Sequence, residues 1–351
     1  MCCGPPEKGK WAMKTVIKGI LGSAALAVVA TGASASTLEE VRSKGYVQCG
    51  VHTGLIGFAA PNDEGEFEGF DVDVCRAVAA AIFGDGNAVQ YTPTNATERF
   101  TALQSGEIDM LSRNTTWTLS RDTSLGFNFA GVNYYDGQGF MINSANLEGI
   151  NSALQLSGAA ICVQTGTTTE LNLADYFRAN NMEYNPVVFQ GFDETNAAYE
   201  AGRCDAYTTD QSGLIALRLT LANPDDHVVL PEIISKEPLG PAVRQGDDEW
   251  FNIVRWTLMA MIQAEESGIT QDNLEEMMNS DNPEIRRILG QEADSSIGAG
   301  LGLDNEWVVN IVREVGNYGE VFDRHLAPIG VPRGLNALWT DGGLMYAMPL
   351  R

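Results

Sequence analysis

The sequence predicts an α/β protein of two lobes, each a mixed, mostly parallel sheet flanked by helices. Strand and helix patterns alternate in the first half of the chain, and the alternation restarts in the second half. With 351 residues the chain is long enough for two cores, and 44% apolar with 19% charged residues is typical of a folded soluble protein. We therefore expect two similar lobes joined by two extended crossover segments.

The first repeat follows residue 35 and has the order β-α-β-α-β. A short helix capped by Thr37 comes first, and Asp71 is expected to cap a later helix whose alanines suit close packing on a sheet. Turn residues 62–65 predict a hairpin between the two. The expected strands are 46–51, 88–93 and 108–111, and the expected helices are 37–42, 72–83 and 98–104.

The second repeat follows an extended aromatic segment, 133–142, which suits an edge strand or a crossover. A second extended segment, 230–243, predicts the return crossover, and the amphipathic helix 248–267 should pack back on the first lobe. The expected strands are 159–163, 184–189 and 204–208, and the expected helices are 170–180, 194–201, 271–279 and 306–315. The expected domains are 36–139 for the first part of lobe 1, 140–237 for lobe 2, and 238–351 for the return to lobe 1 and a C-terminal extension that braces it.

Residues 1–35 predict a secretory signal peptide with an upstream extension. Lys14 and Lys18 precede an apolar run, and residues 33–35 fit the A-x-A cleavage pattern. An uncleaved anchor is the alternative. The net charge of −24 argues against a nucleic-acid partner, because phosphates require a basic surface.

The cysteines after residue 35 agree with export, because their number is even. Their positions predict one local disulfide per lobe, Cys49 with Cys75 and Cys162 with Cys204, and buried free thiols are the alternative. Scattered histidines and the lack of a CxxC motif predict no metal site. The glycines of 298–302 follow no strand, so we expect no nucleotide cofactor.

Polar residues follow the third strand of the first repeat. Arg113 and Arg121 lie beyond strand 108–111, with hydroxyl and amide side chains between them. Open α/β sheets bind ligands beyond the carboxyl ends of their strands, and an arginine fork can grip two carboxylate oxygens. The segment therefore predicts a carboxylate site, and a polar surface loop with ordinary ion pairs is the alternative.

The second repeat offers complementary groups. The turn 166–168 opens a helix, where free backbone N–H groups favour an anion, and Asp210 ends a strand where it could receive an ammonium group. Each of these features, taken alone, could be a simple helix cap. Together with the arginines they predict a pocket for a zwitterion, an α-amino acid.

Several segments resemble the periplasmic general L-amino-acid-binding proteins of ABC importers. They are TWTLSRDTSLGFNF, GVNYYDGQGFMI, VQTGTTTELNLADYF, AGRCDAYTTDQSGL, VGNYGEVFDRHL and RGLNALWTDGGLMYA. The resemblance covers nearly all of 37–351. It implies a type II periplasmic-binding fold, a periplasmic monomer that closes around an L-amino acid, and delivery of the ligand to a membrane ABC permease without any catalysis.

The resemblance also implies roles for residues of the two predicted half-sites. Arg121 would grip the α-carboxylate of the ligand, with hydrogen bonds from Asn114 and Thr116 on the same loop. Thr168 would complete the carboxylate site from the second lobe. Asp210 would hold the α-ammonium group.

Phe58, in the loop after the first strand, would cover the aliphatic part of the ligand. Smaller relatives that bind basic amino acids have an aromatic ring where this chain has Ala96, so a roomier pocket and broad specificity are expected. Arg113 would meet an acidic or amide side chain, or else be held by a protein carboxylate.

Two rival functions use the same fold. A dehydratase-like enzyme would need a general acid or base in the cleft, for which the candidates are Glu170, Asp136 and Asp193. A sensor would bind the same ligand but report it to a membrane kinase or chemoreceptor.

Overall fold

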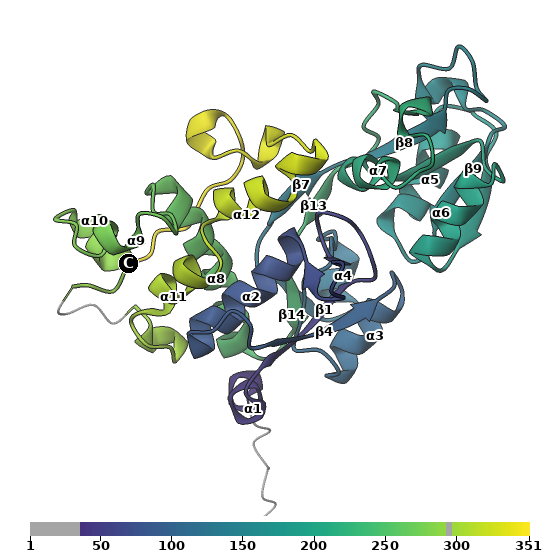
Figure 1. The fold of residues 1–351 in the computed structure, drawn as a ribbon. Coiled ribbons are helices and arrows are strands. Elements are labelled where there is room, and N and C mark those ends of the chain that lie inside the picture. The colour runs from purple at the N-terminus through teal and green to yellow at the C-terminus, as the bar shows by residue number, and fades with distance from the viewer. Residues whose placement is uncertain (1–35, 293–296) are drawn as a thin grey trace, which may run out of the picture. The chain divides into compact units, whose positions relative to one another are not determined.

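The computed structural model describes residues 36–292 and 297–351, and the signal peptide predicted in 1–35 lies outside these ranges. The described residues form one compact unit that contains two five-stranded sheets (Figure 1). No helix in the described ranges is long and apolar enough to cross a membrane.

The first sheet has the strand order β4-β1-β5-β14-β6. Its strands are β1 (Val47–His52), β4 (Val89–Thr94), β5 (Met110–Leu111), β6 (Phe127–Phe129) and β14 (Ala242–Arg244). Strand β1 lies parallel to β4 and β5, with Cys49 opposite both Tyr91 and Met110, whereas β14 is antiparallel to β5 and β6. Five of the six residues of β1 are buried, as is typical of a parallel strand that is covered on both faces.

The helices that belong with this sheet are α1 (Thr37–Lys44), α2 (Phe70–Phe83), α3 (Glu98–Ser105), α4 (Leu119–Thr123) and α8 (Asp248–Glu266). Two predicted caps are wrong. Ser36, not Thr37, caps α1, through a capping box with Glu39. Helix α2 begins at Phe70, and the carboxylate of Asp71 bonds to a loop of the binding site instead of to its own helix.

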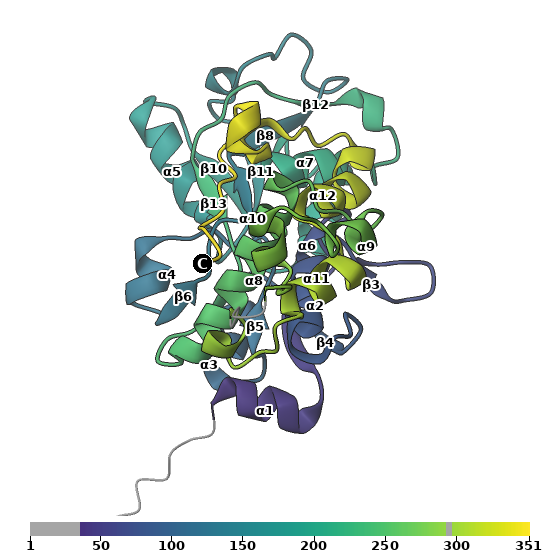
Figure 2. The same ribbon diagram turned by 90° about the vertical axis from the view of Figure 1, so that its left-hand side faces the viewer.

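The second sheet repeats the mixed pattern, with the order β10-β9-β11-β8-β12. Its strands are β8 (Gln138–Asn143), β9 (Ala160–Gln164), β10 (Asn185–Phe189), β11 (Ala206–Asp210) and β12 (His227–Val229). Its helices are α5 (Thr168–Ala179), α6 (Phe192–Glu200) and α7 (Gln211–Arg218), and α5 and α7 flank the sheet (Figure 2). The predicted two-lobed α/β fold with mixed sheets is therefore confirmed.

Both predicted disulfides are present. Cys49 of β1 is bonded to Cys75 of α2, and Cys162 of β9 is bonded to Cys204, which precedes β11. Each bond therefore ties a central strand to another segment of its own lobe. Buried free thiols, the alternative from the sequence, are ruled out for these four cysteines.

Two short strands connect the lobes. Strands β7 (Tyr134–Asp136) and β13 (Glu237–Leu239) pair antiparallel, and in their register Asp136 lies opposite Glu237. They are the two expected crossovers. The predicted lobe boundary at 139/140 falls within β8, just after β7, and the boundary at 237/238 falls within β13. Both boundaries stay predictions.

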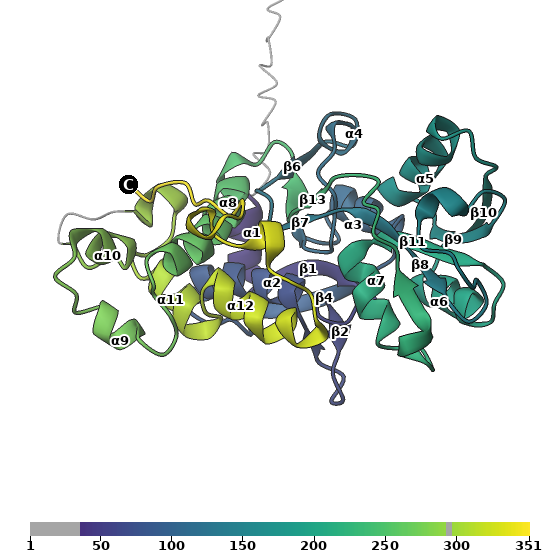
Figure 3. The same ribbon diagram turned by 90° about the horizontal axis from the view of Figure 1, so that it is seen from above.

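The chain beyond residue 268 packs against the first lobe. Its helices are α9 (Leu274–Met277), α10 (Pro283–Ile288), α11 (Trp307–Glu314) and α12 (Tyr318–His325). Helices α11 and α12 lie against α2 and α8 (Figure 3). In addition, Arg324 and His325 of α12 contact the buried carboxylate of Asp73 at 2.7 and 2.8 Å.

The smaller elements complete the chain. The strands β2 (Ala60–Pro61) and β3 (Phe67–Glu68) form the predicted hairpin. Short 3₁₀ turns lie at Ala153–Gln155, Pro224–Asp226, Ala299–Leu301, Ala327–Ile329, Gly334–Asn336 and Trp339–Asp341.

The C-terminal extension also contacts crossover strand β7. The backbone N–H of Tyr135 donates to Asn336 Oδ1 (2.6 Å), and Asn336 Nδ2 donates to Tyr135 O (3.2 Å). The hydroxyl of Tyr318 donates to Asn133 O (2.8 Å), just before the strand. Asn336 is buried, so these bonds fix one side of the crossover without competition from water.

Asn336→Ala should therefore lower the free energy of unfolding by about 2 kcal/mol, because it leaves a backbone N–H and C=O of β7 without partners. Urea denaturation followed by circular dichroism measures this loss. Asn279→Ala is the matched control, because the exposed side chain of Asn279, just past helix α9, donates only to the carbonyl of Glu275. Equal stability of the two variants would contradict a bracing role for Asn336.

Candidate functional site

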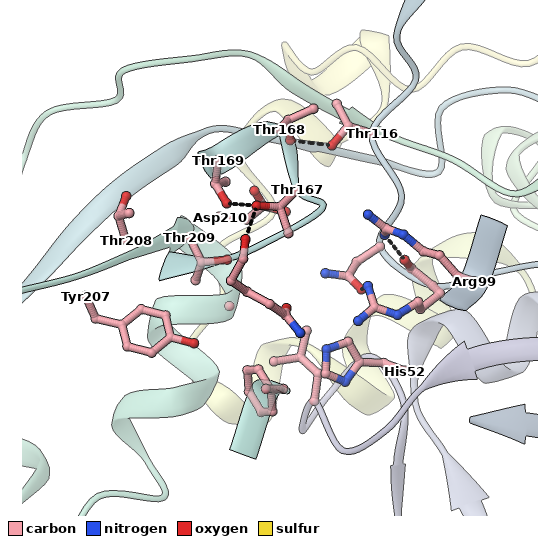
Figure 4. Close-up of a pocket in the computed structure, with 16 residues that line it drawn as sticks. His52, Arg99, Thr116, Thr167, Thr168, Thr169, Tyr207, Thr208, Thr209 and Asp210 are labelled. Carbon is pink, nitrogen blue, oxygen red and sulfur yellow. Dashed lines mark hydrogen bonds between the residues drawn. The ribbon is translucent and has the colours of Figure 1, made fainter. Parts of the chain in front are cut away.

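A pocket lies where the C-terminal ends of strands β1 and β5 in the first lobe face the C-terminal ends of strands β9 and β11 in the second. Figure 4 shows Arg99 and His52 together on one side, with Thr116 and Thr168 close to each other. The lining residues are His52, Leu55, Arg99, Arg113, Asn114, Thr116, Gln164, Thr167, Thr168, Thr169, Phe192, Tyr207, Thr208, Thr209, Asp210 and Gly213.

The loop after β5 is held in place by Asp71. Its carboxylate accepts hydrogen bonds from Asn114 N (2.6 Å), Asn133 Nδ2 (3.1 Å) and Ser112 Oγ (3.3 Å). Asn114 has a left-handed backbone (φ 28°), a conformation that asparagine tolerates better than most residues. Burial raises the pKa of Asp71, and the three donors oppose that rise. Asp71 thus shapes the loop that carries the predicted carboxylate site.

Arg113 reaches the pocket with part of its guanidinium free. Its Nε donates to Thr94 O (3.0 Å), whereas Nη2 is buried and has no hydrogen-bond partner. No described carboxylate forms an ion pair with it, so the structure does not support the expectation that a protein carboxylate holds Arg113. Burial lowers the pKa of Arg113 to about 9, which leaves the group cationic at neutral pH.

Arg99 is a second pocket arginine, which sequence reasoning missed. Helix α3 buries it, and its Nη1 donates to Thr115 Oγ1 (3.1 Å) while its Nε donates to Ala96 O (3.1 Å). Burial and the neighbouring charge of Arg113 lower its pKa. The position of Arg99 could have indicated this, because it stands in the first turn of helix α3, which precedes β5 and the loop with Arg113.

Arg121 does not line the pocket in this structure. Its Nη1 donates to Thr116 O (2.7 Å), and its guanidinium lies 4.9 Å from the ring centre of Phe100. Burial lowers its pKa to about 10. Arg121 thus lies behind Thr116, and its contact with a ligand carboxylate stays a prediction.

The start of helix α5 brings the second lobe close to the first. Gly166 has a left-handed backbone (φ 75°), and a Cβ there would meet Thr97 Cγ2 at 2.5 Å. The cap of the helix is Thr167, whose Oγ1 accepts from Glu170 N (3.1 Å). Thr168 is therefore not needed as a cap, and its side chain lines the pocket.

The hydroxyls of Thr116 and Thr168, both predicted to bind the ligand, have a protein partner in this structure, and their contact with a ligand stays a prediction. They donate to Glu237 Oε2 at 2.6 and 2.8 Å. Glu237 comes from crossover strand β13 and is fully buried. Sequence reasoning missed it, because an acidic residue in an extended segment carries no distinctive pattern.

Asp210 presents a buried carboxylate without a partner. It stands at the N-terminus of α7 but makes no side-chain capping bond, which rules out the cap alternative. No hydrogen bond or ion pair in the described chain uses its carboxylate, and the residue is only 6% exposed. Burial, with the negative charges of Asp136 and Glu237, raises its pKa well above the usual value, and the cations Arg99 and Arg121 oppose this.

Phe58 does not line the pocket and is corrected to a core residue. It is 1% exposed and packs edge-on against Phe70 and Tyr134. The loop contributes Leu55 to the pocket instead. The sequence alone could not show which apolar residue of the loop, Leu55 or Phe58, faces the pocket.

His52 also lines the pocket and bridges to the second lobe. Its ring meets Phe192 edge-on, with ring centres 4.8 Å apart. Burial and the nearby arginines lower its pKa well below the usual value, so the ring is neutral. Its Nδ1 accepts from Gly54 N (3.1 Å), so the proton is on Nε2.

The candidate acids for catalysis lie elsewhere. Glu170 accepts from Gly166 N (3.0 Å) and Thr165 Oγ1 (3.0 Å), and Asp136 is bonded to Ser212. Neither they nor Asp193 line the pocket. Among the described residues, no cluster of three or more potential ligands could hold a metal ion.

Asp210→Asn should stabilise the unliganded protein at neutral pH. Because the folded state raises the pKa of Asp210, stability is lost as pH rises from the unfolded value, about 3.9, through the folded value. We expect a gain of roughly 1 kcal/mol or more at pH 7 and almost none at pH 4, since one pKa unit corresponds to about 1.4 kcal/mol.

Urea denaturation at several pH values checks this. The control is Asp175→Asn, because Asp175 is exposed on α5 and pairs only with Arg178. A gain in Asp210→Asn that is the same at pH 4 and pH 7 would contradict the electrostatic explanation.

Comparison with known proteins identifies the family. The model of the bacterial extracellular solute-binding proteins, family 3, matches residues 47–273. The general L-amino acid-binding periplasmic protein AapJ of Rhizobium johnstonii is 65% identical over 341 residues, which cover 96% of this chain and 99% of that protein. The glutamate/glutamine/aspartate/asparagine-binding protein BztA of Rhodobacter capsulatus is 57% identical over 335 residues, 94% of this chain and 98% of that protein.

A solved structure supports the same family. An ABC transporter periplasmic binding protein from Brucella ovis with glutathione bound is 68% identical, with a TM-score of 0.89. The match covers 91% of this chain and 100% of that one. The two-lobed fold, the cleft between its sheets and these matches have one explanation: the chain belongs to the bacterial extracellular solute-binding proteins of family 3.

Proposed function

We propose that this protein captures L-amino acids in the periplasm by hinge closure and delivers them to an ABC-type permease. The observation that carries the proposal is a pair of unsatisfied groups in one pocket. The carboxylate of Asp210 from the second lobe has no described partner, and Nη2 of Arg113 from the first lobe has none either. The printed names of the relatives support the same ligand class and the same transport system.

In this proposal, Asp210 binds the α-ammonium group and Arg121 binds the α-carboxylate. An ammonium group beside Asp210 replaces the water lost on burial and offsets the repulsion from neighbouring acids. Arg121 uses one nitrogen on Thr116 O, which leaves its remaining donors for a ligand. Asn114, on the loop held by Asp71, lines the same pocket as Asp210.

The side chain of the ligand would meet the basic half of the pocket. Arg113 and Arg99 are buried cations without carboxylate partners among the described residues, and His52 offers an Nε2–H donor. These groups favour acidic and amide side chains, as the name of the Rhodobacter capsulatus relative also indicates. Broad specificity, expected from the small side chain of Ala96, stays a prediction, because Ala96 does not line the pocket.

Capture works because each lobe presents only half of the site. Arginines lie on the first lobe and Asp210 on the second, so a ligand that bridges them binds the closed form more tightly than the open form. This difference drives closure about the crossover strands β7 and β13. The permease can then recognise the closed form, and no bond in the ligand is made or broken.

Glutathione is a second candidate ligand. The relative from Brucella ovis was solved with it bound, and its γ-glutamyl end carries the free α-ammonium and α-carboxylate groups of an amino acid. The Asp210 and Arg121 sites would hold that end, and the basic residues would face the rest of the tripeptide.

Isothermal titration of protein that has been unfolded and refolded to remove carried-over ligand tests the proposal against the twenty L-amino acids and glutathione. We expect several to bind, with acidic and amide side chains among the tightest. No binding to any of them would contradict the proposal. Turnover of a bound amino acid would favour the enzyme alternative.

Arg113→Gln should weaken glutamate and aspartate binding by roughly 10- to 100-fold, because it removes a charge-assisted hydrogen bond. Binding of alanine and leucine should weaken less than about threefold, because Arg113 is expected to contact the ligand's side chain and not its α-ammonium or α-carboxylate group. Arg178→Gln is the control, since Arg178 is exposed on α5. An equal loss for all ligands would assign Arg113 to the α-carboxylate instead.

A further inference from the structure

The carboxylate of Glu237 is surrounded by four hydrogen-bond donors beneath the pocket. Oε2 accepts from Thr116 Oγ1 (2.6 Å) and Thr168 Oγ1 (2.8 Å). Oε1 accepts from Asn172 Nδ2 (2.8 Å) and Ser235 Oγ (2.5 Å). Each oxygen therefore has its lone pairs occupied, and a proton on either one would displace a donor. Both carboxylate oxygens of Glu237 therefore act as acceptors in all four of these hydrogen bonds.

That acceptor fixes the direction of two hydroxyl groups. A threonine hydroxyl has one proton to donate and two lone pairs that can accept. Because Thr116 and Thr168 both give their protons to Glu237 in the shorter bonds, neither donates to the other, and their lone pairs are left for another partner. The two oxygens are 3.3 Å apart, and both residues line the pocket, whereas Glu237 does not.

Two acceptor oxygens match an ammonium group and do not match a carboxylate. An ammonium group has three N–H donors, and Asp210, which lines the same pocket, offers a free carboxylate for another. A ligand carboxylate, by contrast, would face the lone pairs of Thr116 and Thr168. It would have to draw their protons away from a buried anion, which would then lose two of its four donors.

We propose that Glu237 is a positioning residue that orients the hydroxyls of Thr116 and Thr168 as acceptors for the α-ammonium group of the ligand. This inference rests on the proposed function and deepens it. It reassigns both threonine side chains from the carboxylate half of the site to the ammonium half. The ligand carboxylate is left to Arg121 and the backbone N–H groups at the start of α5.

The location of Glu237 suits this role. Crossover strand β13 connects the lobes, and Glu237 bonds to Thr116 of the first lobe and to Thr168 and Asn172 of the second. Its cross-strand neighbour is Asp136, another acid. Both lobes therefore reach the ammonium site through one side chain at the hinge.

The experiment compares L-glutamate with glutarate, which has the same two carboxylates but no α-ammonium group. Isothermal titration gives the ratio of the two dissociation constants in the wild type and in Glu237→Met, a variant of similar length without an acceptor oxygen. We expect glutamate binding to weaken about 10-fold or more, because the freed hydroxyl protons turn toward the ammonium group. Glutarate binding should change less than about threefold or become tighter.

Thr116→Val is the second variant, because it removes one acceptor and keeps Glu237, so it tests the idea even where Glu237→Met does not fold. Its glutamate-to-glutarate ratio should change in the same direction. Glu232→Gln is the matched control, since Glu232 also accepts from a serine hydroxyl and a backbone N–H, but outside the pocket. Circular dichroism confirms that each variant is folded.

The outcomes distinguish a failure of the proposed function from a failure of the role of Glu237. A wild type that binds no amino acid would contradict the proposed function itself. A wild type that binds glutamate, with variants that keep the wild-type ratio or lose both ligands equally, would overturn only the role of Glu237.

Discussion

The antiparallel pairing of β7 with β13 is the constraint on which the site depends. All chain connections between the two sheets run through these strands, and their register places Asp136 opposite Glu237. Like charges directly opposite each other are unfavourable in a strand pair. Burial and the charge of Glu237 contribute to a raised pKa of Asp136, about 6, although bonds from Ser212 oppose the rise. The crossover strands thus place two acidic side chains near Asp210, where the α-ammonium group of the ligand is proposed to bind.

The charges of the cleft are separated by lobe. Arg99 and Arg113 come from the first lobe, and Asp210 comes from the second. A protein selected only for stability would pair or replace buried charges of this kind, since an unpaired buried charge costs free energy. Their retention is understandable where a zwitterion supplies both missing partners at once. In the proposed function, binding of the ligand would therefore remove a free-energy cost of the empty state.

Much of the fold followed from the sequence because its signals are local. Alternation of strand and helix patterns predicted both sheets, and consecutive cysteines predicted both disulfides. The position of Asp210 at a strand end correctly indicated a pocket residue, because the carboxyl ends of neighbouring strands meet at one edge of a sheet.

The site residues that the sequence did not predict correctly depend on the direction in which side chains point in the tertiary structure. Phe58 and Leu55 are both apolar residues of one loop, and only packing decides that Phe58 faces the aromatic core. Asp71 looked like a helix cap because its position in the sequence suits one, yet its carboxylate points to Asn114. Glu237 has partners 121 and 69 residues away in the sequence, which no local pattern can indicate.

The two disulfides also bear on how the chain matures. Each joins a cysteine to the next one along the chain after residue 35, Cys49 to Cys75 and Cys162 to Cys204. When a chain is exported N-terminus first, the first pair emerges and can be oxidised before the second pair appears. Sequential oxidation then yields the native pairing directly, so maturation needs an oxidant but no reshuffling of mispaired bonds. Because neither bond joins the two sheets, oxidation stiffens each lobe and leaves the hinge free to move.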